Sequence, residues 1–413
     1  MTDTPISAGA WLRRQLQSLL STGPGDTWAL AAIGAVWAMG LVAMIASIPA
    51  QPVVITHWAN GHMMDRPTLL PAFAEEFNDA GYRTKSGNRI EVRLTRANSG
   101  EIAGELRSRV LDGSPIDRGK PDPTLVTPAA DHWIVDLNFA LGRQVLDQDA
   151  TETVATTYIG IVTSREMAEC LGWPERDIGF ADVVELASDP RGWSNYPCAK
   201  AEWGREALLA FTYPSRSSTA RSVLYTLYSI AANKPAEDLT IDDVKRPDVV
   251  QYVKRFQSAI DCYVPDTLDL NSKILTPPSC HFFFIAEDNL VKLYQGKVSV
   301  MVGSTMVTRT LERDLVMIYP KEGAIVHNHS AFVVDAEFVG KEQSEAARTW
   351  ISFLRAEPQQ RAFMQEGFRR TTAGPCMDPL GSPFSPCADT PEKPIYPDRI
   401  DPEVAQAILE AWE

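Results

Sequence analysis

The sequence predicts an α/β protein with two lobes, preceded by one transmembrane helix. Its 413 residues, of which 45% are hydrophobic, are enough for two core-sized lobes. Short apolar runs alternate with amphipathic helical stretches along most of the chain, which is typical of a parallel sheet covered by helices. A long charge-free run near the N-terminus stands apart from this pattern and predicts the membrane helix.

The charge-free run extends from Trp28 to Ile48 and has the length that the hydrocarbon core of a bilayer requires. A cleavable signal peptide has a shorter apolar core and an A-x-A-like exit, so we expect an uncleaved anchor over residues 28–50. Arg13 and Arg14 precede the run and favour a cytoplasmic segment over residues 1–27, which leaves the rest of the chain extracytoplasmic. A buried core helix is the alternative interpretation.

The net charge of −14 argues against nucleic acid as a partner. Before the anchor, Arg13 and Arg14 balance Asp3 and Asp26, so the excess of negative charge belongs to the chain that follows. No basic patch in that part of the sequence offsets it.

Three units follow the anchor, each with polar or small residues directly after an apolar strand. Their strands are predicted at residues 53–58, 90–94 and 124–127, with helices at 67–81 and from 98 onward and a small-residue loop at 128–131. Asn98 and Glu101 are spaced like a capping box. This βαβα order predicts parallel strands, whose carboxyl ends form the edge at which α/β sheets bind ligands.

A similar unit lies in the middle of the chain. Ala207–Thr212 is a short apolar run, Tyr213–Ser217 has turn chemistry, and an amphipathic helix follows. Ser217, Ser218 and Thr219 are therefore predicted at the helix start, where unpaired N–H groups and the helix dipole can bind an anion or a polar ligand. The alternative is that these hydroxyls only cap the helix.

The remaining elements are predicted from the same patterns. Pro247 begins a helix with Val249, Val250, Val253 and Ile260 facing inward. Strands are expected at 158–163, 281–285, 298–302, 315–319 and 332–334, the last returning to the first sheet. Helices are expected at 341–356, 359–367 and 402–412, and the stretch up to Trp193 reads as interrupted helix. The proline-dense stretch 375–402 is expected to be irregular.

All six cysteines follow the anchor, and an even number in an exported domain suggests disulfides. Fifteen pairings are possible, and none of the cysteines has C-x-x-C metal spacing. Loop length favours pairing sequence neighbours, which would join Cys170 to Cys198, Cys262 to Cys280, and Cys376 to Cys387.

From residue 51 to about 372, the order of these segments resembles the extracellular solute-binding proteins of bacterial ABC importers, of the class II periplasmic-binding-protein fold. The matching segments are VVITHWANG, RANSGEIAGELRSRV, DPTLVTPAADHW, YIGIVTS, FTYPSRSSTARSVLY, GKVSVMVGS to YPKEG, and EAARTWISFLRAEPQQRAFMQEGFR. The resemblance implies two Rossmann-like lobes with a ligand cleft between them. Lobe 1 would comprise residues 51–157 and 327–390, lobe 2 residues 158–326, and residues 391–413 a C-terminal tail.

The resemblance also implies which loops line the cleft. Carried over by position, the ligand-binding candidates are Trp58, Asn60, Ser99, Thr127, Asp131, Tyr213, Ser217, Ser218, Thr219, Ser304 and Thr305. A serine near a helix start in each lobe is closest to the sulfate- and molybdate-type oxyanion binders. Trp58 and Asn60 depart from that pattern, so an aromatic platform for a sugar or an organic acid stays open.

Five histidines fall in or near the expected cleft loops: His57, His62, His132, His327 and His329. A transition-metal site would use such residues, but no cysteine or closely spaced carboxylate supports one. Surface or hinge histidines are the preferred interpretation, so neither a metal nor a cofactor is expected.

None of the common catalytic motifs occurs, including G-x-S-x-G, H-E-x-x-H and the P-loop, so the chain is not expected to be an enzyme. The resemblance implies an anchored protein that captures a small polar ligand for an ABC permease. The alternative is an anchored sensing or scaffolding domain on the same fold, without a role in transport.

Overall fold

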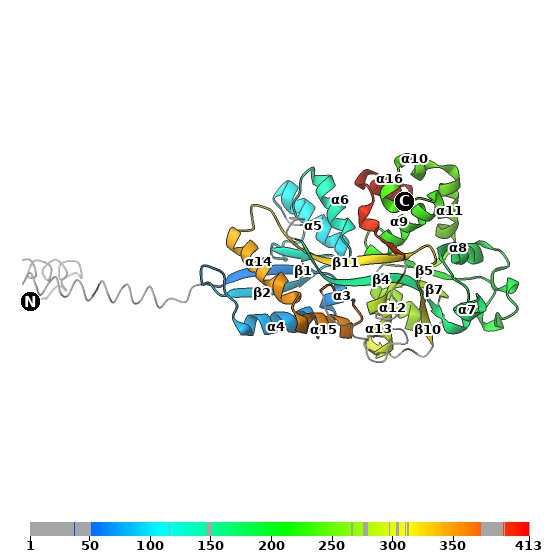
Figure 1. Cartoon of the computed structure of the whole chain (residues 1–413), viewed down its shortest axis with the longest axis horizontal. Coiled ribbons are helices and arrows are strands. Elements are labelled where there is room, and N and C mark those ends of the chain that lie inside the picture. Colours follow the sequence, from blue (N-terminus) through cyan, green and yellow to red (C-terminus); the bar gives the residue numbers. More distant parts are fainter. Residues whose placement is uncertain are drawn as a thin grey trace, which may run out of the picture. The chain divides into compact units, whose positions relative to one another are not determined.

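The computed structural model describes a defined part of the chain (Figure 1). From residue 51 onward it omits 115, 147–150, 266, 276–279, 297, 303–304, 310, 312–313, 373–390, 392 and 413, and before residue 51 it describes only Trp37. The predicted anchor therefore lies, apart from Trp37, outside the described residues. Within the described part, no helix is long and apolar enough to cross a membrane. The chain divides into two compact units, Met1–Pro52 and Val53–Glu413. All the strands and helices described from residue 53 onward belong to the second unit.

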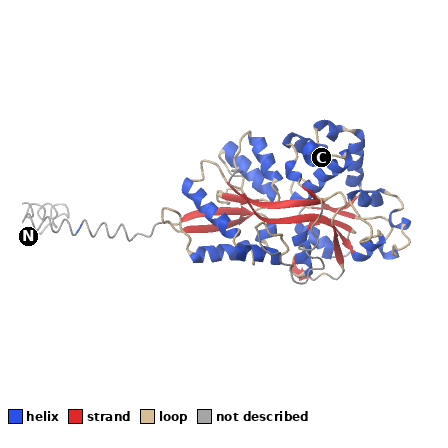
Figure 2. Ribbon diagram, viewed as in Figure 1, coloured by secondary structure: helices blue, strands red, loops and turns tan. Residues whose placement is uncertain are grey.

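The second unit is built on one long mixed sheet with helices on both sides (Figure 2). Along the sheet the order is β2 (Ile90–Arg96), β1 (Val53–Ala59), β3 (Leu125–Thr127), β11 (Ala324–Val333), β4 (Glu152–Ser164), β7 (Phe282–Ala286), β5 (Leu209–Thr212) and β6 (Ile260–Val264). At its margins, β10 (Leu315–Ile318) pairs with β4 and β12 (Pro394–Ile395) pairs with β11. A separate hairpin joins β8 (Val298–Val302) to β9 (Thr305–Arg309).

The expectation of a parallel sheet holds at the two ends and fails in the middle. β1 pairs in parallel with β2 and β3, and β5 pairs in parallel with β6 and β7. In contrast, β4 and β11 run antiparallel to each other and to the neighbours β7 and β3. Both strands extend beyond the predicted stretches, because Thr153–Thr157 and His327–His329 pair through their backbones although most of their side chains are polar.

Two hydrophobic cores lie on opposite faces of the β1–β3 end, which we call the first half. On one face α4 (Leu70–Ala80), α14 (Lys341–Leu354) and α15 (Glu357–Gln365) pack onto Ile55 through Phe77, Trp350 and Phe363. On the other face α5 (Ser99–Asp112) and α6 (His132–Leu141) bury residues such as Ile102 and Ile134 against Val126.

The β5–β7 end, which we call the second half, also has a core on each face. One contains residues of α8 (Phe180–Ser188), α9 (Ser218–Ala232), α11 (Pro247–Ser258) and the C-terminal α16 (Pro402–Trp412). The other contains residues of α12 (Thr267–Leu275), α13 (Glu287–Tyr294) and β8. The described chain also has the short helices α3 (Gly61–Met64), α7 (Arg165–Cys170) and α10 (Ile241–Lys245). Among the described elements, only β4 and β11 contribute buried residues to cores of both halves.

Three local predictions need correction. Ile260 does not belong to the helix begun by Pro247, because that helix ends at Ser258 and Ile260 starts β6; Phe256 completes the buried face instead. The helix α6 was not predicted, because its apolar residues cover most of its circumference. The helix expected from Pro67 begins at Leu70.

Two of the three predicted disulfides are confirmed, Cys170–Cys198 and Cys262–Cys280. Both lie in the second half. Cys376 and Cys387 lie outside the described residues, so their pairing stays a prediction.

Candidate functional site

A cavity of about 130 Å³ lies where the two halves face each other, with residues of both in its wall. Two long helices begin at this cavity, α5 from the first half and α9 from the second. Asn98 caps α5 by accepting a bond from Glu101 N at 2.8 Å, and the predicted capping box is present. Two positive helix ends therefore meet across one small space, which favours a negatively charged occupant.

The hydroxyl residues at the start of α9 have different roles. Ser217 accepts a bond from Ala220 N at 3.4 Å and is the N-cap, as the alternative interpretation required. Ser218 Oγ instead reaches across the cavity edge, accepting from Trp133 Nε1 at 2.9 Å and donating to Ser99 Oγ at 3.0 Å. Ser218 thus connects the two halves directly.

Basic side chains outnumber acidic ones in the cavity wall. Arg66, Arg96, Arg216 and Lys292 line it, against one carboxylate, Asp65. Asp65 receives two bonds from Arg96, at 2.7 and 2.8 Å. Burial lowers the pKa of Lys292, and like-charge repulsion from Arg66 acts in the same direction, whereas Asp65, Asp288 and Glu366 oppose the shift. An anion would relieve that repulsion.

Two asparagines complete the wall from the second half. Asn271 and Asn289 are each only 6% exposed. Asn271 Oδ1 has no hydrogen-bond partner among the described residues. A buried polar atom without a partner is costly, so a ligand or water that pairs with it would be bound favourably.

The structure gathers five of the predicted ligand-binding residues at this cavity: Asn60, Ser99, Ser217, Ser218 and Thr219. Other candidates lie elsewhere. Thr127 is buried with its Oγ1 2.8 Å from His57 Nε2, and Asp131 Oδ2 accepts from Ser330 Oγ at 2.8 Å. Ser304 lies outside the described residues, and Thr305 begins β9, where its side chain is not described.

The aromatic candidates do not form a platform in this cavity. Trp58 is completely buried in the core beneath α5 and α6, and its Nε1 donates to Pro121 O at 3.2 Å. Its position in β1 explains this, because residues on alternate strand positions face opposite sides of the sheet. Tyr213 is exposed and stacks on Tyr263 in a different cavity.

Four of the five histidines, His57, His132, His327 and His329, are buried and are therefore not surface residues, while their placement at a hinge stays a prediction. Burial lowers the pKa of His57 and of His327 to about 3. Trp350 Nε1 donates to His57 Nδ1 at 3.1 Å, which leaves the proton of the neutral ring on Nε2, facing Thr127. No group of three His, Cys, Asp or Glu in the described part of the chain could hold a metal ion.

Sequence reasoning missed most of the charged and amide residues of the wall. Arg96 lies two residues before Asn98 and Arg216 lies within the predicted turn that ends at Ser217, and this proximity was the available signal. Asn271, Asn289 and Lys292 lie on α12 and α13, and only the tertiary fold brings them to the cavity.

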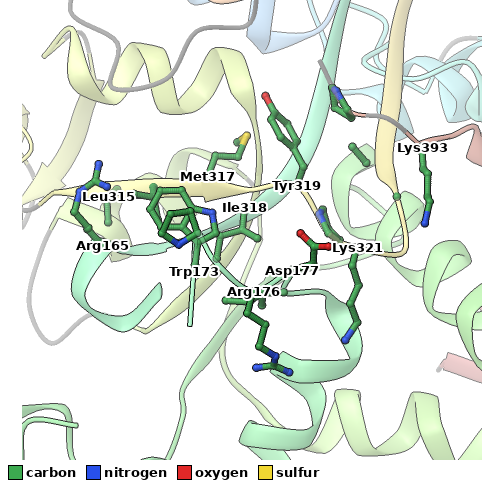
Figure 3. A pocket seen from close by; sticks show the side chains of 17 residues that line it. Arg165, Trp173, Arg176, Asp177, Leu315, Met317, Ile318, Tyr319, Lys321 and Lys393 are labelled. Atoms are coloured by element: carbon green, nitrogen blue, oxygen red, sulfur yellow. The ribbon is translucent and has the colours of Figure 1, made fainter. Parts of the chain in front are cut away.

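A larger cavity of about 580 Å³ lies in the second half beside β10 (Figure 3). Three of its four basic residues already have acidic partners, since Arg165 pairs with Asp314 and both Arg176 and Lys321 pair with Asp182; the fourth is Lys393. None of the described helices of eight or more residues starts in its wall, so it is the weaker candidate for an anion site.

Comparison with solved structures identifies the fold. Iron-bound HitA from Pseudomonas aeruginosa is 12% identical with a TM-score of 0.53, and the match covers 87% of this chain and 99% of that one. A periplasmic thiamin binding protein is 12% identical with a TM-score of 0.57, covering 87% and 95%. The IdiA/FutA protein of Trichodesmium, in complex with iron and citrate, is 11% identical with a TM-score of 0.53, covering 87% and 98%.

No protein-family model matches the chain, and neither does any curated protein. At these identities the structural likeness establishes the fold alone. That fold is the one used by the solute-binding proteins of ABC importers, as the sequence resemblance implied.

Proposed function

We propose that this protein is an anchored, extracytoplasmic solute-binding protein that captures a small anion between its two halves and delivers it to an ABC permease. The halves would move as lobes, residues 51–157 with 327–390 against 158–326, and the tail 391–413 would be carried on the second lobe. The proposal involves binding without catalysis and requires no cofactor.

The observation that carries the proposal is the meeting of the α5 and α9 N-termini across a cavity with four basic side chains and one acidic one. A ligand held by both halves stabilises the closed arrangement, because its contacts to the second half exist only when the halves are together. The fold shared with periplasmic binding proteins supports the same function.

The size and chemistry of the cavity favour a small oxyanion. Helix N–H groups, Ser hydroxyls and cations all donate hydrogen bonds, which suits an acceptor-rich ligand. Asp65 and Asn271 add acceptors at the wall, so an oxyanion that also carries a proton, or a small hydroxy acid, would satisfy more of the cavity.

The proposal is tested by exhaustive dialysis of the full chain in detergent, followed by a thermal-shift screen and calorimetry. The panel contains sulfate, molybdate, phosphate, citrate, ferric ion, thiamin and glucose. We expect a small oxyanion to raise the melting temperature and to bind with a stoichiometry of one. Binding of only the neutral sugar or of thiamin, a cation, would contradict the proposal.

The alternative is a sensing or scaffolding domain, and direct contacts between the halves favour it. Arg221 Nη1 of α9 bonds to Asp136 Oδ2 of α6 at 2.8 Å, and its guanidinium lies 3.6 Å from the centre of the Trp133 ring. Such contacts hold the halves together without a ligand, which suits a scaffold. Genes for a permease and an ATPase beside this one would support transport, whereas a signalling or assembly cluster would support the alternative.

A further inference from the structure

We infer that Asp288 acts as a built-in anion that holds the cleft closed when no ligand is present. The inference rests on the proposed function only in assuming that the two halves can separate. It concerns what keeps them together, which is independent of the ligand's identity.

Asp288 lies at the start of α13 in the second half and is completely buried. Its Oδ2 is 2.7 Å from Arg66 Nη2 and 2.9 Å from His62 Nδ1, and both partners belong to the first half. Arg66 Nη2 also donates to the backbone oxygen of Asp288 at 2.9 Å. One carboxylate therefore joins two donors from the opposite side of the cleft, as a bound anion would.

Burial makes these bonds consequential. Arg66 is only 2% exposed, so opening the cleft must break a desolvated ion pair, whose separation is costly if neither charge gains a new partner. Water would hydrate both groups in an open state. The pair therefore favours closure by the amount that its attraction and hydrogen bonds exceed the hydration that both groups lose on closing. The opposing effects on Asp288 sum to a lowered pKa, with His62 and Arg66 outweighing desolvation, and the group is therefore a carboxylate at neutral pH.

The same contacts give Arg66 a different role from the other cations of the cavity wall. Arg66 lines the cavity, yet it is held by Asp288 and lies 3.5 Å from Glu366 Oε2. Its charge is thus compensated within the protein. A ligand would meet mainly the other cations and the helix ends, while Arg66 serves to join the halves.

The second flank of the cleft is closed differently. There the cross-cleft contacts include the partly exposed Arg221–Asp136 pair, the Ser218–Ser99 and Trp133–Ser218 hydrogen bonds, and the stacking of Arg221 on Trp133.

Asp288 is completely buried, and so is its neighbour Glu287 on α13, which pairs with Arg369 of the other half at 2.6 Å. Asp288 differs in that its partners His62 and Arg66 line the cavity, so removing its charge should weaken closure at the ligand site itself.

The test measures the distance between spin labels at two exposed positions, Arg107 on α5 and Lys254 on α11, by pulsed electron paramagnetic resonance. The full chain in detergent is used after dialysis, and native mass spectrometry verifies that no small molecule remains. We expect one narrow short-distance population for the parent protein. In Asp288→Asn most molecules should shift to a longer, broader distribution.

Asp182→Asn is the matched control. Asp182 also binds two cations, Arg176 and Lys321, but all three residues belong to the second half, so its distance distribution should equal that of the parent. Arg66→Met removes the opposite partner and should open the cleft as Asp288→Asn does. This second variant keeps the test decisive if Asp288→Asn fails to fold by circular dichroism.

Two results would overturn the inference: a ligand-free parent that is already open, or folded Asp288→Asn and Arg66→Met variants that keep the parent distance. Neither result depends on whether any anion binds. A failed ligand screen would reject the proposed function and leave this measurement unaffected.

Discussion

Ser218 Oγ on α9 donates a hydrogen bond to Ser99 Oγ on α5 at 3.0 Å, which links the first turns of two helices from opposite halves. The two serines therefore mark the point at which a ligand would contact both helix starts. Ser217, one residue earlier, is occupied as the cap of α9.

This difference gives a prediction for two neighbouring variants. Ser218→Ala should lower the affinity for the best oxyanion of the screen about tenfold, because a neutral hydrogen bond contributes about 0.5 to 1.5 kcal/mol. Ser217→Ala should instead cost about 1 kcal/mol of stability, as the loss of an N-cap does, and change affinity less. Calorimetry and urea unfolding measure the two effects. Equal affinity in Ser218→Ala and the parent would place the ligand elsewhere.

Trp58→Ala should destabilise the protein by about 3 to 5 kcal/mol, because it leaves a large cavity in the core beneath α5 and α6. At a temperature where the variant stays folded, its ligand affinity should be that of the parent, since Trp58 does not reach the cleft. Urea unfolding and calorimetry give both values. Trp58→Phe is the milder control. If Trp58→Ala lost affinity while its stability stayed unchanged, the hypothesis that Trp58 forms an aromatic platform for the ligand would be supported instead.

Replacing both cysteines of either described disulfide by serine should lower the free energy of unfolding by about 3 kcal/mol, the value for closing a loop of this length. The bridges span 28 residues, from Cys170 to Cys198, and 18 residues, from Cys262 to Cys280. Peptide mapping without reductant should recover both and should also show Cys376 joined to Cys387. Alkylation of any of the six cysteines in the oxidised, denatured protein would contradict the full pairing.

Stability should fall as the pH drops below about 6.5. Unfolded His57 takes up a proton near that pH, whereas the buried ring, with a pKa of about 3, stays neutral, so protons favour the unfolded state. The resulting slope is about 1.4 kcal/mol per pH unit for each such histidine, and His327 behaves in the same way. In His57→Gln, the free energy of unfolding measured with urea between pH 5 and 7 should depend less steeply on pH, by the contribution of one proton. An unchanged slope would show that His57 is protonated in the folded protein.

The charge-free run from Trp28 to Ile48 predicts that the mature protein keeps its N-terminal region and remains with the membrane after a high-salt wash. Fractionation with mass spectrometry of the purified chain tests this. A soluble form that begins near Gln51 would show a cleaved leader instead.

The sequence predicted correctly those elements whose ends are formed by residues close together in the chain. The Asn98–Glu101 capping box and the turn before Ser217 place two helix starts correctly, because the residues that form these ends are adjacent in the chain. Trp58 shows the limit of such reasoning. The tryptophan next to the predicted loop faces the core, because the alternation within β1, and not distance from the loop, sets its direction.

The missed residues of the cleft have a different cause. Asp288 and Lys292 lie on a short helix with no sequence feature that connects it to His62 or Arg66, more than two hundred residues earlier. Long-range pairs of this kind are set by the packing of the whole sheet, so a single sequence does not reveal them.

The two long strands have a consequence for how the chain reaches this structure. β3 ends the first half on its inner side, and its neighbour is β11, which the ribosome produces about two hundred residues later. Until then the edge of β3 has no strand to pair with, and Trp350 of α14, which fills the adjoining core, is made later still. The first half is therefore expected to remain incomplete through most of synthesis and to depend on protection of its open edge. The second half also waits for the end of the chain, because Ile408 and Trp412 of α16 belong to its core.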